Sequence, residues 1–166
     1  MGFRARPLPS LNDKDNVMNV EMNYLDRTEL TNDGPPGTYT GIPDSVLDSL
    51  ITRASMIMRS KTRSAIYDVD GSGMPTEERI RFAFADATSA QVLAWVQGEV
   101  YEELISGGST ADALVSSSSN NGASVTLDNG ERLAARRRLL AGELSTGARL
   151  ILDDAGLLHG DPWLWM

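Results

Sequence analysis

The sequence predicts a mainly α-helical fold: a small helical bundle around one long central helix, with a long loop or short β-hairpin insertion and extended N- and C-terminal arms. Apolar residues recur every three or four positions in several separate stretches. One stretch, 77–105, would form a helix about 43 Å long, enough to cross a small domain. The 166 residues are 41% hydrophobic and 23% charged, which is the composition of one globular domain.

Charge and composition exclude several classes of protein. The formal net charge of -8 argues against a surface that binds nucleic acid everywhere, although it allows a local basic strip and favours basic partners. The chain has no cysteine, so disulfides, thiolate metal sites and thiol nucleophiles are excluded. No apolar run approaches the roughly 18 residues of a membrane span, and the first residues lack the apolar block of a signal peptide. We therefore expect no association with a membrane.

The N-terminal segment 1–22 reads as an arm before the helical domain 23–156. It is rich in proline and charge and poor in large apolar groups, so it is expected to be flexible alone or to order on a partner. A loop dense in turn-forming residues follows at 32–43. Asp44 is then a candidate N-cap for the first long helix. Its buried face is expected to carry Val46, Leu47, Leu50, Ile51, Ala54, Ile57 and Met58.

The central helix is expected to begin at Thr76, whose hydroxyl could cap it, and to run to Ile105. Apolar residues fall on two opposite sides of this helix. One side carries Ile80, Ala83, Phe84, Ala87, Ala94, Trp95, Gly98, Tyr101 and Ile105. The other side, which also includes Ala85 and Leu104, supplies candidate subunit-interface residues, namely Phe82, Val92, Leu93, Val96 and Val100. Either the remaining helices of the domain or a neighbouring subunit could cover it.

Residues 106–130 are rich in serine, asparagine and glycine, which predicts a long loop with a short extended piece at 123–127. A helix is expected from Glu131 to Ala141, ending near Gly142. It carries Arg136, Arg137 and Arg138, whose directions spread over about 200° and form a collar of positive charge. We expect these arginines to pair with carboxylates of the same or an adjacent chain, and they are also interface candidates.

Ser145 is the expected cap of a last helix that buries Ala148, Ile151, Leu152 and Ala155 and ends at Gly156. The segment 157–166 is an apolar C-terminal tail. Its last residues, Trp163, Leu164, Trp165 and Met166, could fold back onto the domain or anchor in a partner.

The stretch from Asp68 resembles the start of a calcium loop, with Asp68, Asp70 and Ser72 at the first three ligand positions and Gly73 at the sixth. Position twelve, which needs a bidentate glutamate, is Arg79. We therefore favour a tight turn in which Asp68 and Asp70 bond local amides, while Gly71 and Gly73 supply positive φ.

No pattern in the sequence indicates an enzyme or a bound cofactor. His159 is the only histidine, which rules out a histidine metal cluster and a serine triad. Phosphate-binding glycine motifs are also missing.

Several short motifs occur in a characteristic order along the chain. They are Tyr67-Asp68-Val69-Asp70, Gly73-Met74-Pro75-Thr76, Ala87-Thr88, Ala90-Gln91-Val92 with Trp95, Leu144-Ser145, and Ala155-Gly156-Leu157-Leu158. From Asn23 to Gly160 this order resembles the head-to-tail adaptor (head completion, connector) proteins of tailed bacteriophages, especially those of actinobacterial hosts.

The resemblance implies a virion protein of the phage neck, made in the host cytoplasm, that forms a homo-oligomeric ring, commonly a dodecamer. Such a ring docks on the portal protein, offers a surface to the next neck or tail-completion protein, and lets DNA pass without reading it. The resemblance also implies that 77–105 builds the ring, that 106–130 faces the channel or the next ring, and that 157–166 contacts the portal. The first 22 residues are longer than the family pattern, so the arm, the tail or both could make the portal contact.

Two other functions stay open from the residues alone. A calcium-binding, EF-hand-like regulatory module would use the Asp68 loop, and a small DNA-binding regulator would use Arg136 to Arg138.

Overall fold

The computed structural model describes residues 22–107, 119–120, 123–124 and 130–158. Within these ranges the chain forms six helices and one two-stranded hairpin, which confirms the mainly α-helical prediction. The elements are α1 (Arg27–Asp33), α2 (Asp44–Lys61), α3 (Glu78–Gln97), α4 (Tyr101–Ile105), β1 (Ser119–Asn120), β2 (Ala123–Ser124), α5 (Gly130–Leu140) and α6 (Thr146–Asp154). The strands pair antiparallel, with Ser119 opposite Ser124 and Asn120 opposite Ala123.

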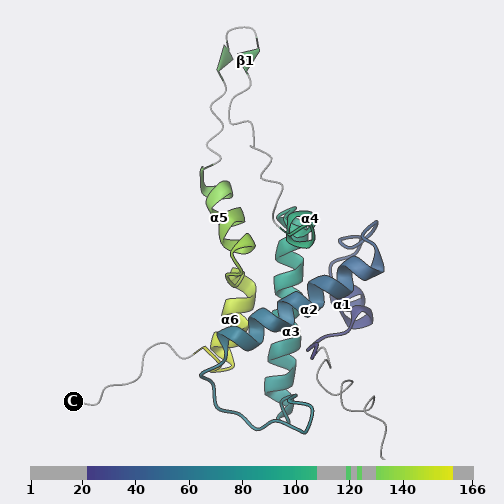
Figure 1. Ribbon diagram of the computed structural model, residues 1–166, viewed down its shortest axis with the longest axis vertical. Coiled ribbons are helices and arrows are strands. Elements are labelled where there is room, and N and C mark those ends of the chain that lie inside the picture. The colour runs from purple at the N-terminus through teal and green to yellow at the C-terminus, as the bar shows by residue number, and fades with distance from the viewer. Residues whose placement is uncertain (1–21, 108–118, 121–122, 125–129, 159–166) are drawn as a thin grey trace, which may run out of the picture.

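Helix α3 is the centre of the bundle. Figure 1 shows α2 crossing it, with α6 packed along one side and α1 on the opposite side of the molecule. Neighbouring helices of the same chain therefore cover the long apolar helix on more than one side. Among the described helices, none is both long and apolar enough to cross a membrane.

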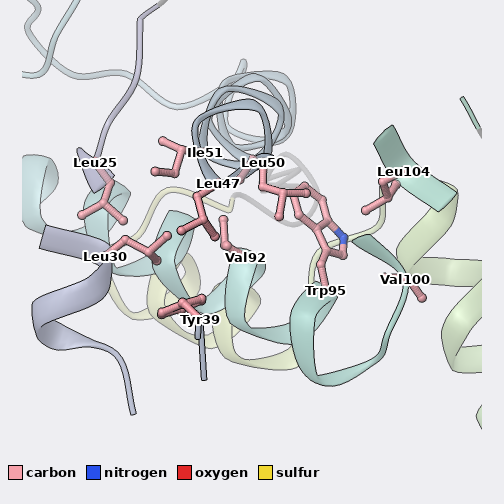
Figure 2. Close-up of a cluster of buried hydrophobic side chains, with 11 residues drawn as sticks. Leu25, Leu30, Tyr39, Leu47, Leu50, Ile51, Val92, Trp95, Val100 and Leu104 are labelled. Atoms are coloured by element: carbon pink, nitrogen blue, oxygen red, sulfur yellow. The ribbon is translucent and has the colours of Figure 1, made fainter. Parts of the chain in front are cut away.

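The C-terminal half of α3 packs with α1, α2 and α4 in what we call the α1-side core. Figure 2 shows Leu47, Leu50 and Ile51 of α2 above Val92 and Trp95 of α3. The cluster consists of Leu25, Leu30, Tyr39, Leu47, Leu50, Ile51, Ala54, Val92, Trp95, Val100 and Leu104. Because burying each large apolar side chain is worth about 1.5–3 kcal/mol, this cluster is a main source of stability.

The N-terminal half of α3 packs with α6 in the α6-side core. Its members are Tyr24, Met58, Ile80, Ala83, Phe84, Ala87, Ala148, Leu152 and Leu157. The Tyr24 and Phe84 rings stack with centroids 4.4 Å apart. The small side chains of Ala83 and Ala87 leave room for a close approach of α6.

The central helix ends at Gln97 and does not continue to Ile105, which corrects the predicted length. The Val100 amide donates to the Trp95 carbonyl at 3.0 Å and the Glu99 amide donates to the Val96 carbonyl at 3.1 Å. This is a Schellman motif, and Val100 and Trp95 make its usual apolar contact within the α1-side core. Glu99 adopts the left-handed conformation, with φ of 52°, that such a motif requires.

Helices α5 and α6 end with the same hydrogen-bond pattern, but with glycine at the left-handed position. Gly142 has φ of 78° and Gly156 has φ of 72°. The Glu143 amide donates to the Arg138 carbonyl at 3.0 Å, and the Leu157 amide donates to the Leu152 carbonyl at 2.8 Å. The predicted ends at these glycines are confirmed. At the end of α3, by contrast, Gly98 comes one residue before the left-handed position, which Glu99 occupies. No glycine therefore marks the end of this helix in the sequence.

The predicted starts of the helices are correct in one case and shifted in two. Ser145 caps α6, accepting a hydrogen bond from the Ala148 amide at 3.2 Å. Asp44 is the first residue of α2 and Pro43 takes the cap position. Thr76 does not cap α3, because its hydroxyl donates to the Asp68 carbonyl at 3.3 Å in the preceding turn.

Candidate assembly surfaces

Helix α5 is the least covered of the longer helices. It has no fully buried residue, and its three leucines, Leu133, Leu139 and Leu140, are half-buried. Leu139 and Leu140 touch the α1-side core from outside. An isolated helix of this length is marginal in water. Contacts near its C-terminal end must therefore hold it against the rest of the chain.

Arg136 provides one of these contacts. It pairs with Glu103 of α4 and donates from Nη1 to the Gly98 carbonyl at 3.2 Å. Both side chains are about three-quarters buried, at 26% and 24% exposed, so solvent screens the pair less than a surface pair. The predicted pairing of an arginine with a carboxylate of the same chain is therefore observed for Arg136.

Arg137 and Arg138 are exposed. At 3.6 residues per turn, Arg138 points about 200° away from Arg136 and thus away from the α3–α4 corner. The ion pairs found among the described residues do not include Arg137 or Arg138. These two cations remain on the outer side of α5.

Gln91 holds the turn between α5 and α6, although no prediction singled it out. It is fully buried, its Nε2 donates to the Glu143 carbonyl at 3.3 Å, and its Oε1 accepts from the Ser145 amide at 2.7 Å. In the sequence, Gln91 lies one helical turn from both Ala87 and Trp95, on the buried face of α3. A polar side chain at such a position is expected to need hydrogen-bond partners.

The candidate interface residues on α3 and just after it divide into three groups. Val92 and Val100 are 0% exposed in the single chain, so they belong to the α1-side core and are withdrawn as interface candidates. Leu93 and Val96 are half-buried, and Val96 packs against that core. Phe82 is 56% exposed and is the member of the set most accessible to another molecule.

An acidic edge lies on α1, its cap and the first turns of α2. We define it as Asp26, Glu29, Asp33, Asp44 and Asp48, all of which are exposed. Asp26 and Glu29 form a reciprocal capping box at the start of α1. Arg27 lies within this edge, with its Nη1 3.0 Å from Asp44 Oδ2 and 3.3 Å from Asp48 Oδ2.

An open groove of about 1200 Å³ runs beside this edge. The acidic residues Asp26, Glu29 and Asp48 line it on one side, and the end of α4 with Leu140 to Gly142 lines it elsewhere. Met56 of α2, 60% exposed, also borders it. Two arginines, Arg27 and Arg53, also line the groove, so it combines three carboxylates and two cations with apolar side chains.

The calcium-like stretch folds as a tight turn. Asp70 Oδ1 accepts from Ser72 Oγ at 2.6 Å, from the Ser72 amide at 2.8 Å and from the Met74 amide at 3.0 Å. These hydrogen bonds lower the pKa of the Asp70 carboxyl below its ordinary value, and the one from the Ser72 hydroxyl has the largest effect. Because three donors already occupy this oxygen, it is poorly placed to bind an ion.

Two details of the predicted turn are corrected. Asp68 takes part through its backbone carbonyl, which accepts from the Thr76 amide at 3.0 Å, instead of through its carboxylate. Gly73 has φ of 85°, whereas Gly71 is not in a positive-φ conformation. Arg79, at the position of the missing calcium ligand, donates to the Ala155 carbonyl at 3.3 Å and so links α3 to the end of α6.

Within the part of the chain that the structure describes, no three metal-binding side chains come together. The candidate portal-binding residues Trp163, Leu164, Trp165 and Met166 lie outside the described residues.

Comparison with protein-family models, curated proteins and solved structures gives no match to this chain.

Proposed function

We propose that this protein is a structural subunit of a tailed-phage neck, forming a homo-oligomeric ring that docks on the portal protein and connects the DNA-filled head to the tail. DNA would pass through the ring without sequence-specific binding. The observation that carries the proposal is α5, an eleven-residue helix with no fully buried residue and two exposed arginines on its outer side. A helix this poorly covered in the single chain gains stability when another subunit packs against it.

The order of sequence motifs supports the same function, since it resembles head-to-tail adaptors from Asn23 to Gly160. The residues of the Asp68 turn favour a structural role as well, because Asp70 is engaged by local donors. The turn leads directly into α3 and orients the start of that helix through the hydrogen bond between Thr76 and Asp68.

The test is assembly on the portal. Full-length protein is mixed with purified portal protein of the same phage, and the products are imaged by negative-stain electron microscopy. We expect an additional ring on one end of the portal. Portal particles that stay unchanged at high concentrations of both proteins would contradict the proposed function.

The portal contact is tested by removing residues 160–166, which include the apolar tail residues. Circular dichroism should show unchanged helicity, because the described helices all end before this segment. Binding to the portal should be lost. A chain lacking residues 1–21 is the matched control, and it shows whether the arm contributes. Normal co-assembly of the tail-deleted chain would exclude the tail as the portal contact.

A further inference from the structure

The outer side of α5 and the acidic edge carry opposite charge. The segment Gly130–Leu140 contains four arginines and one glutamate, a formal charge of +3. Residues 26–49, which include α1 and the start of α2, contain five acidic residues and one arginine, a formal charge of -4. In a chain whose total is -8, α5 is the most basic of the six described helices. Its natural partner is an acidic surface.

The acidic edge of the same copy cannot be that partner. In Figure 1, α5 lies on the left of the molecule and α1 on the right, with α3 and α4 between them. A contact between α5 of one copy and the edge of another would therefore join two different patches. Such a head-to-tail contact repeats from copy to copy and closes into a ring when the rotation allows.

We propose that Arg137 and Arg138 of one copy dock on the acidic edge of the next copy, beside the groove along α2. Arg136 takes no part, since Glu103 and the Gly98 carbonyl of its own chain already hold it. Asp33 and Asp48 are the acceptors best placed to change partner. Asp33 lies at the end of α1, and Arg27 retains Asp44 at 3.0 Å when Asp48 turns to a neighbour. This inference rests on the proposed function, for which it supplies the contact between subunits.

The groove gives the incoming helix a place to lie. Its volume is about 1200 Å³, and Asp26, Glu29 and Asp48 belong both to its wall and to the acidic edge. The exposed Met56 at its border offers apolar contact for a half-buried side chain of α5 such as Leu133. Charge would set the register of this contact, and apolar burial would add to its affinity.

A charge swap tests the contact in the full chain. The first variant carries Arg137→Glu and Arg138→Glu, and the second carries Asp33→Arg and Asp48→Arg. Each variant alone places like charges across the contact, so analytical ultracentrifugation should show loss of the oligomer that the unaltered chain forms. An equimolar mixture restores opposite charge at every contact and should recover the oligomer. High salt should weaken the unaltered oligomer, because it screens exposed charges.

The control variant carries Arg81→Glu and Arg149→Glu, an equal change of charge at exposed positions of α3 and α6. It should assemble normally. Either test variant assembling like the unaltered chain, or a mixture that stays monomeric, would overturn the proposed contact. Salt-dependent binding of the unaltered chain to duplex DNA, lost in the first variant without any change in oligomer, would also overturn it.

Cross-linking provides a second measurement that does not depend on charge reversal. The chain has no cysteine, so Arg138→Cys and Asp48→Cys can be introduced singly and the two reduced proteins mixed. A bis-maleimide reagent is then added, because its spacer covers the reach of an Arg–Asp pair, which exceeds the roughly 7 Å between Cα atoms that a disulfide allows. A covalently linked pair of the two variants is expected, and its absence in assembled protein would contradict the contact. If the charge-swap variants behave as expected but the oligomer does not bind portal protein, the proposed function is refuted and the contact between copies stands. A chain that stays monomeric both alone and with portal would refute both.

Discussion

Helices α5 and α6 follow one another in the chain but belong to the molecule in different ways. Helix α6 buries Ala148 and Leu152 completely in the α6-side core, and a serine caps its start. Helix α5 is longer and buries no residue fully, and polar contacts of Arg136 help to hold it. Helix α6 therefore completes the core of the single chain, whereas α5 presents most of its surface outward. Matched substitutions in the two helices should separate these roles.

The largest effect is expected for Leu152→Ala in α6. Leu152 is fully buried, so its truncation removes apolar contacts and leaves a cavity, which should cost about 2–5 kcal/mol of unfolding free energy. Denaturant unfolding followed by circular dichroism measures this. A loss below about 0.5 kcal/mol, the range of surface substitutions, would mean that α6 is not part of the core.

Gln91→Leu should have the next largest effect, because it cuts the link between α3 and the turn that joins α5 to α6. Leucine is similar in size to glutamine but cannot form hydrogen bonds. The Ser145 amide and the Glu143 carbonyl are therefore left without their partner, at a cost of about 1–3 kcal/mol of unfolding free energy. Denaturant unfolding is compared with that of Gln97→Leu, an exposed position at the end of the same helix. Equal stabilities of the two variants would show that the Gln91 hydrogen bonds contribute nothing.

The left-handed residues at the helix ends predict a pair of opposite effects. Gly142→Ala places a side chain at φ of 78° and should destabilise the protein by about 1 kcal/mol. Glu99→Gly relieves the same strain at the end of α3 and should stabilise it, by up to about 1 kcal/mol. Thermal unfolding of both variants should shift in opposite directions. A shift in the same direction would contradict the Schellman geometry at one of the two sites.

The smallest effect on the single chain is expected for Leu133→Ala in α5. Leu133 is half-buried, so the same truncation as at Leu152 should cost less than about 1 kcal/mol. Denaturant unfolding followed by circular dichroism, as for Leu152→Ala, measures the loss. A loss as large as that of Leu152→Ala would show that α5 is as integral to the single chain as α6.

Helical periodicity was enough to predict α2, the buried side of α6 and most of the buried face of α3. It misled at the end of α3, since Trp95 and Val100 lie on the two predicted apolar stripes of a continuous helix. The chain turns between them because both residues enter the same core. The sequence does not distinguish the buried Val92 and Val100 from the exposed Phe82, because the apolar pattern of one helix does not say which of its sides α1 and α2 cover.

Local sequence is enough to place most helices, since amphipathic periodicity, Ser145 at a start and Gly142 and Gly156 at ends act within a few residues. Which charged side chains stay exposed depends instead on how the helices pack. Three arginines stand side by side in the sequence, yet Arg136 faces Glu103 across the α3–α4 corner while Arg137 and Arg138 are exposed. The reason is geometric: consecutive helical residues point about 100° apart, and only the position of a neighbouring helix selects the one that finds a partner.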